Sequence, residues 1–197
     1  MKKMFAYFIA VSVMLFANSN DTKQECLYKA DNGVSVEWKA YKTPEKIGVG
    51  GTFDTVVYQA ATKQAGNIRD LLLHSSVKIE TKSVNSNNKG RDQKLVTAFF
   101  SLMTGDKIVA KIIEVSEHKL VVSVEMNGIE KKVPMHYSYQ DGKLHAEGVI
   151  DLFDFQASKA LQRINKACYA LHKGKTWNDV SIGFKMHIPC VPSKDKK

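Results

Sequence analysis

The sequence predicts an all-β protein with helical insertions, in which eight antiparallel strands close into a barrel. Apolar and polar residues alternate along most of the chain from Gly33 onward, and a period of two is the pattern of strands with one buried face. The dipeptides Asn127-Gly128 and Asp141-Gly142 interrupt this alternation, and both favour hairpin turns because their residues accept positive φ. Closing the sheet would remove its exposed edges.

The elements follow from these patterns in chain order. The predicted strands are 34–41, 51–59, 77–83, 107–117, 120–126, 129–139, 144–150 and 180–188. Helical insertions are expected at 68–74, 93–103 and 156–172. The glycine-rich run 47–51 lacks the lysine and serine of a phosphate loop, so it is interpreted as a turn at the barrel rim. Asp154 is expected to cap the last helix.

The interior of the barrel is either hollow or filled. Residues on the predicted inner face include small ones at 40, 110, 146 and 148 and methionines at 126, 135 and 186. Small residues leave volume and methionine adapts to an irregular guest, which favours a cavity for an elongated apolar molecule. Apolar inner positions are also what a solid core requires, so a two-sheet sandwich with a filled core is the alternative.

The N-terminus has the pattern of a secretory signal peptide over residues 1–19. Lys2 and Lys3 precede an uncharged apolar run, 4–16, which is shorter than the roughly 20 residues that a membrane-spanning helix needs. Ala17-Asn18-Ser19 supplies a small-x-small cleavage pattern. The sequence therefore predicts export, with residues 20–197 forming a single domain.

The charge balance favours acidic partners. The formal net charge is +9, and the chain stays basic after removal of the signal peptide. Anionic lipid headgroups and nucleic acid both attract such a surface, but export disfavours nucleic acid.

Three cysteines in an exported chain suggest one disulfide and one free thiol. Cys168 shares a helical face with apolar residues spaced three and four apart, which predicts that it is buried. Cys26 and Cys190 flank the first and last predicted strands, and an antiparallel closure would bring them together. We expect these two to pair, although sequence alone does not determine connectivity.

The motifs of common enzymes and metal sites are missing. The six histidines form no HxH or HExxH pair, and no GxSxG, P-loop or GxGxxG motif occurs. Cys168 and His172 lie four residues apart on one helix, but no further ligand is near in sequence. We therefore expect no enzyme activity, no metal and no cofactor other than a bound lipid or isoprenoid.

Four segments, in order, resemble the YceI family of exported, lipocalin-like proteins. They are Ser83-Val84-Asn85-Ser86 with Arg91-Asp92, Leu95 and Phe99-Phe100; Ile47 to Phe53; Asn127-Gly128 with Lys132-Val133; and Phe153-Asp154-Phe155. The resemblance covers about residues 33–189. It implies a lipocalin-like antiparallel barrel whose apolar tunnel binds polyisoprenoids, fatty acids or their amides in the periplasm, without catalysis. The predicted 156–172 helix and the two paired cysteines depart from the general pattern.

The leading hypothesis is a periplasmic carrier for a long-chain apolar ligand. Each buried CH₂ contributes about 0.8 kcal/mol, so a long chain binds with few polar contacts. The polar stretch 83–95 is interpreted as a rim element in which Arg91 faces a headgroup or ties the loop to the barrel with Asp92. The candidate ligand-binding residues are Trp38, Phe53, Arg91, Asp92, Leu95, Phe99, Val122, Val124, Met126, Met135, Tyr137, Ile150, Phe184 and Met186.

Two other hypotheses stay open at the level of the sequence. The first is a stress-related interaction module with a filled core, which forms a homodimer or binds a protein or an anionic membrane surface. The second is an enzyme that acts on a lipid or quinone precursor through a polar pair, Arg91 and Asp92, at the tunnel mouth.

Overall fold

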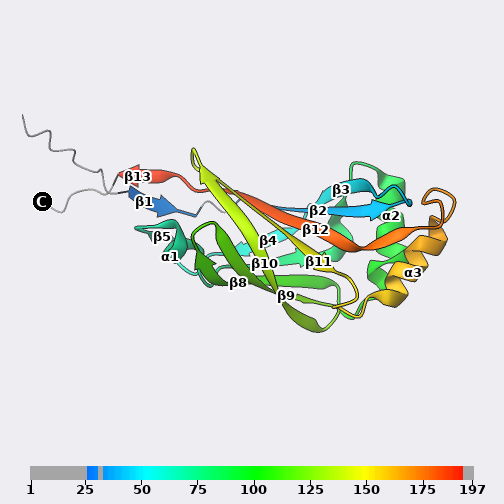
Figure 1. Cartoon of the computed structure of the whole chain (residues 1–197). Helices are drawn as coiled ribbons and strands as arrows, with labels where there is room; N and C mark the ends of the chain where they lie inside the picture. Colours follow the sequence, from blue (N-terminus) through cyan, green and yellow to red (C-terminus); the bar gives the residue numbers. More distant parts are fainter. Residues whose placement is uncertain (1–25, 31–32, 193–197) are drawn as a thin grey trace, which may run out of the picture.

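The computed structural model describes residues 26–30 and 33–192, and its main feature is one strongly curled antiparallel sheet (Figure 1). Ten strands lie side by side in this sheet. In spatial order they are β4 (Val56–Gln59), β6 (Ser76–Glu80), β8 (Lys107–Ser116), β9 (Lys119–Met126), β10 (Ile129–Gln140), β11 (Lys143–Asp151), β12 (Thr176–His187), β2 (Val34–Lys42), β3 (Ile47–Phe53) and β7 (Val84–Asn85). The predicted signal peptide, residues 1–19, lies outside the described residues.

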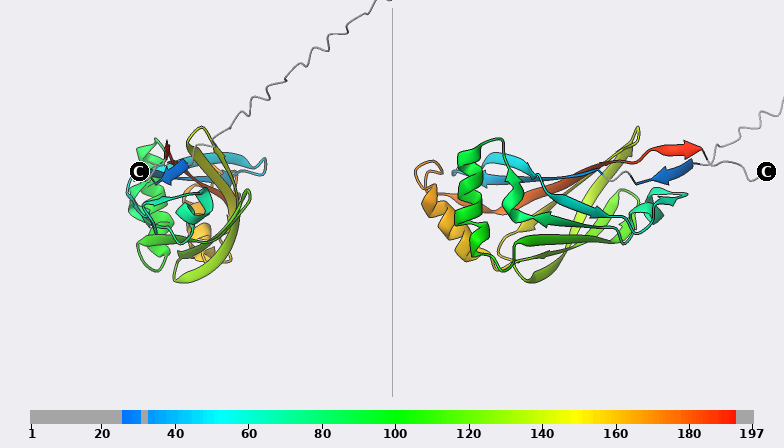
Figure 2. Two further views of the ribbon diagram at one scale, coloured as in Figure 1. Left: turned by 90° about the vertical axis from the view of Figure 1, so that its left-hand side faces the viewer. Right: turned by 180° about the vertical axis from the view of Figure 1, so that it is seen from behind.

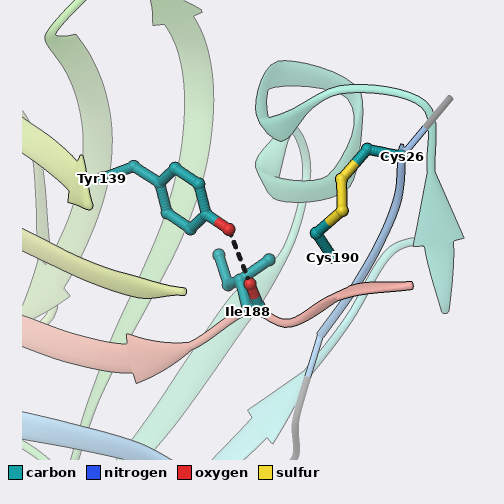
Figure 3. Close-up of a disulfide and its surroundings, with 4 residues drawn as sticks. All are labelled: Cys26, Tyr139, Ile188 and Cys190. Atoms are coloured by element: carbon teal, nitrogen blue, oxygen red, sulfur yellow. Dashed lines mark hydrogen bonds between the residues drawn. A yellow bond between two sulfur atoms is a disulfide. The ribbon is translucent and has the colours of Figure 1, made fainter. Parts of the chain in front are cut away.

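A small second sheet closes one end of the molecule. It has the order β13 (Cys190–Pro192), β1 (Cys26–Lys29) and β5 (Gln64–Ala65), with the short helix α1 (Ile68–Leu72) nearby. Cys26 and Cys190 form a disulfide across it, with their Cα atoms 5.4 Å apart (Figure 3). The predicted pairing is therefore confirmed, although the two cysteines lie in short strands of their own and not beside the main sheet.

The longer helices lie at the opposite end of the molecule (Figure 2). α2 (Lys89–Ala98) is followed directly by the 3₁₀ turn η2 (Phe100–Leu102), and α3 (Ser158–Ala167) packs against α2. A further 3₁₀ turn, η1 (Thr81–Ser83), precedes β7. All three predicted helical insertions exist, and the helices at 68–72 and 158–167 are shorter than expected.

The prediction of a closed eight-stranded barrel is wrong in two respects. The sheet has ten strands, and its edge strands β4 and β7 are not hydrogen-bonded to each other, so it is a curled half-barrel (Figure 2, left). The predicted strand 51–59 breaks at Asp54 and Thr55, because both backbone N–H groups donate to Ser83. The Asp54 N–H lies 2.9 Å from the Ser83 carbonyl oxygen, and the Thr55 N–H lies 3.0 Å from the Ser83 hydroxyl oxygen. After this break the chain crosses from one edge of the sheet to the other.

Two local predictions are also wrong. The run 47–51 is part of β3, which pairs with β2 along its length, and is not a rim turn. Asp154 does not cap α3, whose first turn follows Ala157 without a side-chain cap. The carboxylate that organises this corner is Asp151, which accepts hydrogen bonds from the Phe153 N–H and the Asn178 amide at 2.8 and 2.7 Å.

The hairpins formed as the turn residues indicate. Asn127-Gly128 and Asp141-Gly142 all have positive φ, and they connect β9 to β10 and β10 to β11. The inner faces of these strands, together with α1 and α3, form the apolar core, which includes the buried Cys168.

Candidate ligand-binding cavity

An apolar cavity of about 560 Å³ runs inside the curled sheet. This volume is within the range of roughly 300–1,000 Å³ that is usual for small-molecule pockets. Alternate residues of β2 and β12 form much of its wall, because successive side chains of a strand point to opposite faces. Trp38 and Phe184 are among these wall residues, and they are only partly buried although they face inward. The space inside the sheet is thus not filled by side chains.

Most of the residues predicted from the sequence line this cavity. They come from six strands, from helix α2 and from the residue that caps its C-terminal end. The predicted residues in the wall are Trp38, Phe53, Arg91, Leu95, Phe99, Val122, Val124, Met126, Met135, Ile150, Phe184 and Met186.

Two predicted residues are not in the wall. Asp92 turns toward the loop before α2, where its carboxylate bonds to Ser86. Tyr137 is half-buried beside the core, and its ring lies 6.3 Å from that of His118 near the hairpin between β8 and β9. The small residues Ala146 and Gly148 are also outside the wall, whereas Ala40 and Ala110 are part of it.

The polar stretch 83–95 is held together at Ser86, which is buried. Asp92 accepts hydrogen bonds from the Ser86 N–H at 2.9 Å and from the Ser86 hydroxyl. Arg91 donates from Nε to the Ser86 hydroxyl oxygen at 2.7 Å and from Nη2 to the Ser86 carbonyl oxygen at 2.8 Å. Asn88 caps α2 by accepting from the Arg91 N–H at 2.9 Å. Arg91 and Asp92 therefore tie the loop to the helix, and Arg91 also borders the cavity.

The mouth of the cavity lies at the end where α2 and α3 meet. The exposed members of the wall are Asn88, Gly90, Lys94 and Leu171, and all of them come from α2 or from the turn after α3. In the 3₁₀ turn after α2, Leu102 is exposed and does not border the cavity. Phe100 of the same turn does border it, with its ring centroid 6.2 Å from that of Phe53.

A hydrogen-bond chain fixes His172 at this mouth. The Asn165 amide donates to the Gly174 carbonyl oxygen at 3.1 Å, which leaves its Oδ1 to accept from the Thr176 hydroxyl at 2.9 Å. The Thr176 oxygen lies 2.7 Å from His172 Nδ1 and must accept, because its proton is already donated. Nδ1 thus carries a proton. Burial, followed by the charges of Lys42 and Lys94, lowers the pKa of His172.

The other end of the cavity lies toward α1. Leu72, Ser75 and Tyr58 line it, and Leu72 and Ser75 are almost completely buried. Burial raises the pKa of the Tyr58 hydroxyl, and the neighbouring Ser75 offsets part of this shift. This end therefore disfavours negative charge.

Sequence reasoning missed part of the wall. Leu161, Ile164 and Cys168 of the α3 segment line the cavity, and their helical spacing was visible but indicated only a buried face. Lys42 and Lys94 gave no signal, because a lysine at a cavity mouth has the same sequence context as a solvated one.

Two further observations bear on the kind of site. Among the described residues, no group of three or more histidine, cysteine or acidic side chains is placed to hold a metal. No helix in the described part of the chain has the length and apolar character needed to cross a bilayer.

Comparisons with known proteins agree with this architecture. A family model described as the YceI-like domain matches residues 28–188. A polyisoprenoid-binding domain from Saccharophagus degradans, implicated in plant cell wall breakdown, superposes with a TM-score of 0.58 at 11% identity, over 83% of this chain and 98% of that one. Burkholderia cenocepacia BcnA superposes with a TM-score of 0.57 at 13% identity, over 81% and 99%. No curated protein sequence matches the chain.

Proposed function

Because the chain belongs to the YceI-like family, we propose that it is a periplasmic carrier that holds a long-chain apolar ligand in the cavity of its curled sheet. The ligand is a polyisoprenoid, a fatty acid or a fatty amide. Lipid or isoprenoid binding is what the family supports in general, and one structural neighbour is itself a polyisoprenoid-binding domain.

The cavity is the observation that carries the proposal. It is long, it is walled by alternate residues of several strands, and its polar residues gather mainly at the end between α2 and α3. An alkyl or prenyl chain inside it would leave water along its whole length, at about 0.8 kcal/mol for each buried CH₂. Shape and length would then decide affinity more than specific polar contacts.

We propose that the protein binds and does not catalyse. The polar pair that a lipid-modifying enzyme would use, Arg91 and Asp92, is engaged with Ser86. Asp92 does not border the cavity, so it is not placed to take a proton from a ligand there. The alternative function, an interaction module, requires a filled core. The cavity inside the sheet disfavours this alternative.

Organic extraction of the protein purified from its native host, followed by mass spectrometry, tests the carrier role. We expect a long-chain lipid or isoprenoid in the extract of the wild-type protein. Ala110→Phe places a ring in the cavity wall and should reduce the extracted amount severalfold, because the ring occupies ligand volume.

Val109→Phe is the matched control, since Val109 neighbours Ala110 in β8 but does not border the cavity. Its extract should equal that of the wild type. A blank extract from all three proteins, each folded to the same thermal stability, would overturn the carrier proposal.

A further inference from the structure

Two lysines from different elements, Lys42 and Lys94, border the cavity at its mouth. Lys42 is the last residue of β2 and pairs with Thr176, the hydroxyl of which bonds to His172. Lys94 comes from α2, one turn after Arg91, and Arg91 and Lys94 both border the cavity. His172 borders the cavity together with Lys42 and Lys94. Its pKa is lowered first by burial and then by the charges of the two lysines.

Neither lysine is neutralised by the protein. Among the described residues, Lys42 and Lys94 form no ion pair. The nearby acidic side chains are engaged elsewhere: Asp179 lies 2.7 Å from Lys46, and Glu45 lies 3.0 Å from Lys173. In the described chain, Glu37 is the one carboxylate in the cavity wall, and it lies 2.6 Å from Lys185.

The two ends of the cavity thus differ in the charge that they accept. At the mouth, the ammonium groups of Lys42 and Lys94 form no ion pair with the described part of the protein, so they favour negative charge. Burial and, after it, these two charges lower the pKa of His172. At the α1 end, burial disfavours an anion, which the raised pKa of Tyr58 reflects. A ligand with one charged end would place that end at the mouth and its tail toward α1.

We infer that the mouth selects long-chain ligands ending in an anionic oxygen headgroup, a carboxylate or a phosphate, which Lys42 and Lys94 bind together. This inference rests on the proposed carrier function and narrows its ligand class. Neutral amides and alcohols of the same chain length then bind more weakly, because they gain the tail contacts but no charge pairing. Both lysines keep one face toward solvent, so their attraction is moderate and screened by salt.

Ligands that share one tail and differ only at the head test the inference. Binding of hexadecanoate, hexadecyl phosphate, hexadecanol and hexadecanamide to the delipidated protein is measured by calorimetry at low and high salt. We expect the two anions to bind about tenfold more tightly than the neutral pair at low salt, with most of the difference lost at high salt. Inorganic phosphate alone should bind at least about a hundredfold more weakly than hexadecyl phosphate, since it gains no tail burial.

Lys42→Gln with Lys94→Gln should remove the preference for anions while leaving hexadecanol affinity within about twofold. Lys78→Gln with Lys132→Gln is the matched control: it removes the same charge from exposed strand positions outside the cavity wall and should keep the preference. Hexadecanol binding shows that the double variants are folded and loaded normally.

Three results would overturn the inference. Equal affinities for all four heads, or a preference for anions that survives Lys42→Gln with Lys94→Gln, would leave the carrier function intact but remove the selection. Tighter binding of hexadecanol or hexadecanamide than of the two anions would also remove the selection for anions. It would indicate that the O–H or N–H of the neutral head group donates a hydrogen bond to His172 Nε2. Failure of every long-chain probe to bind would overturn the carrier function itself.

Discussion

Ser86 is the residue that converts a polar loop into a fixed wall of the cavity. Its N–H, hydroxyl and carbonyl oxygen are all bonded to Arg91 or Asp92, and the residue is almost fully buried. A buried polar group that loses its partner costs about 1–3 kcal/mol, because nothing replaces the water that it gave up.

Asp92→Ala should therefore lower the free energy of unfolding by about 1–3 kcal/mol, since it leaves the Ser86 N–H without an acceptor. Gln93→Ala, at the exposed neighbouring position of the same helix, should change it by less than about 0.5 kcal/mol. Urea denaturation of both variants measures the difference. Equal stabilities would show that the Ser86 contacts contribute little.

At this scale the sequence could identify the stretch but not assign its contacts. A role for Arg91 and Asp92 in tying the loop was one of two interpretations, because adjacent side chains do not reveal a shared partner. Ser86 is their common partner because the loop folds back on the first turn of α2, and Asn87 has a φ of 58° in this loop. That turn depends on contacts with Asp54, which is 31 residues away from Asn85 in the chain.

Strand β3 shows how closely the elements are packed at the edge of the sheet. A Cβ atom at Gly51 would overlap the Asn85 carbonyl oxygen and would come within 2.8 Å of the Trp38 ring. Glycine is thus required here for the close approach of β7 and of the loop before α2.

Gly51→Ala should destabilise the protein by about 1–3 kcal/mol, because β7 and Trp38 must move apart to admit the methyl group. Gly48→Ala, in the same strand, is the control: its Cβ would meet only the flexible end of Lys39, which can move away. Thermal unfolding compares the two variants. A lower stability for Gly48→Ala than for Gly51→Ala would contradict this account of the packing.

Elements held by local chemistry could be predicted, and elements held by distant partners could not. The hairpins at Asn127-Gly128 and Asp141-Gly142 formed because each turn depends on the φ of its own residues. The break at Asp54 and Thr55 could not be foreseen, because alternation continues through it and the hydrogen bonds that cause it come from Ser83. The glycine run 47–51 was misassigned as a turn. Glycines are typical of turns, but they also occur in a strand where neighbouring chains approach too closely for a side chain.

At the scale of the whole molecule, the disulfide fastens the ends of the described chain together. Cys26 and Cys190 are separated by 164 residues, and they join β1 to β13 at the end opposite α2 and α3. A bond that closes so long a loop limits the freedom of the unfolded chain.

Cys26→Ser with Cys190→Ser should lower the free energy of unfolding by about 2–4 kcal/mol while the main sheet still forms. The expected shift appears in urea denaturation of the oxidised protein, and a reductant should shift the wild type by a similar amount. Cys168→Ser serves as the control for loss of a thiol. The reductant should shift the urea denaturation of this variant by as much as it shifts that of the wild type. A wild-type curve that ignores the reductant would contradict the prediction.

The hollow interior was foreseen only in part. Small residues and methionines on the predicted inner faces favoured a cavity, and Ala40, Ala110 and three methionines do border it. Its volume could not be predicted, because it depends on how far the sheet curls and on the helices that cover one end. The pairing of Lys42 with Lys94 at the mouth arises from the same packing, which brings the end of β2 to the side of α2 and α3.

The seam between β4 and β7 gives the sheet a mechanical property that a closed barrel lacks. No ladder hydrogen bond joins these two edge strands, so their separation can change without breaking a rung elsewhere in the sheet. Away from the corner where Asp54 and Thr55 bond to Ser83, widening the sheet along this line breaks no ladder hydrogen bond, whereas a closed barrel would have to lose backbone bonds. The space that the sheet encloses can thus vary in width along one side.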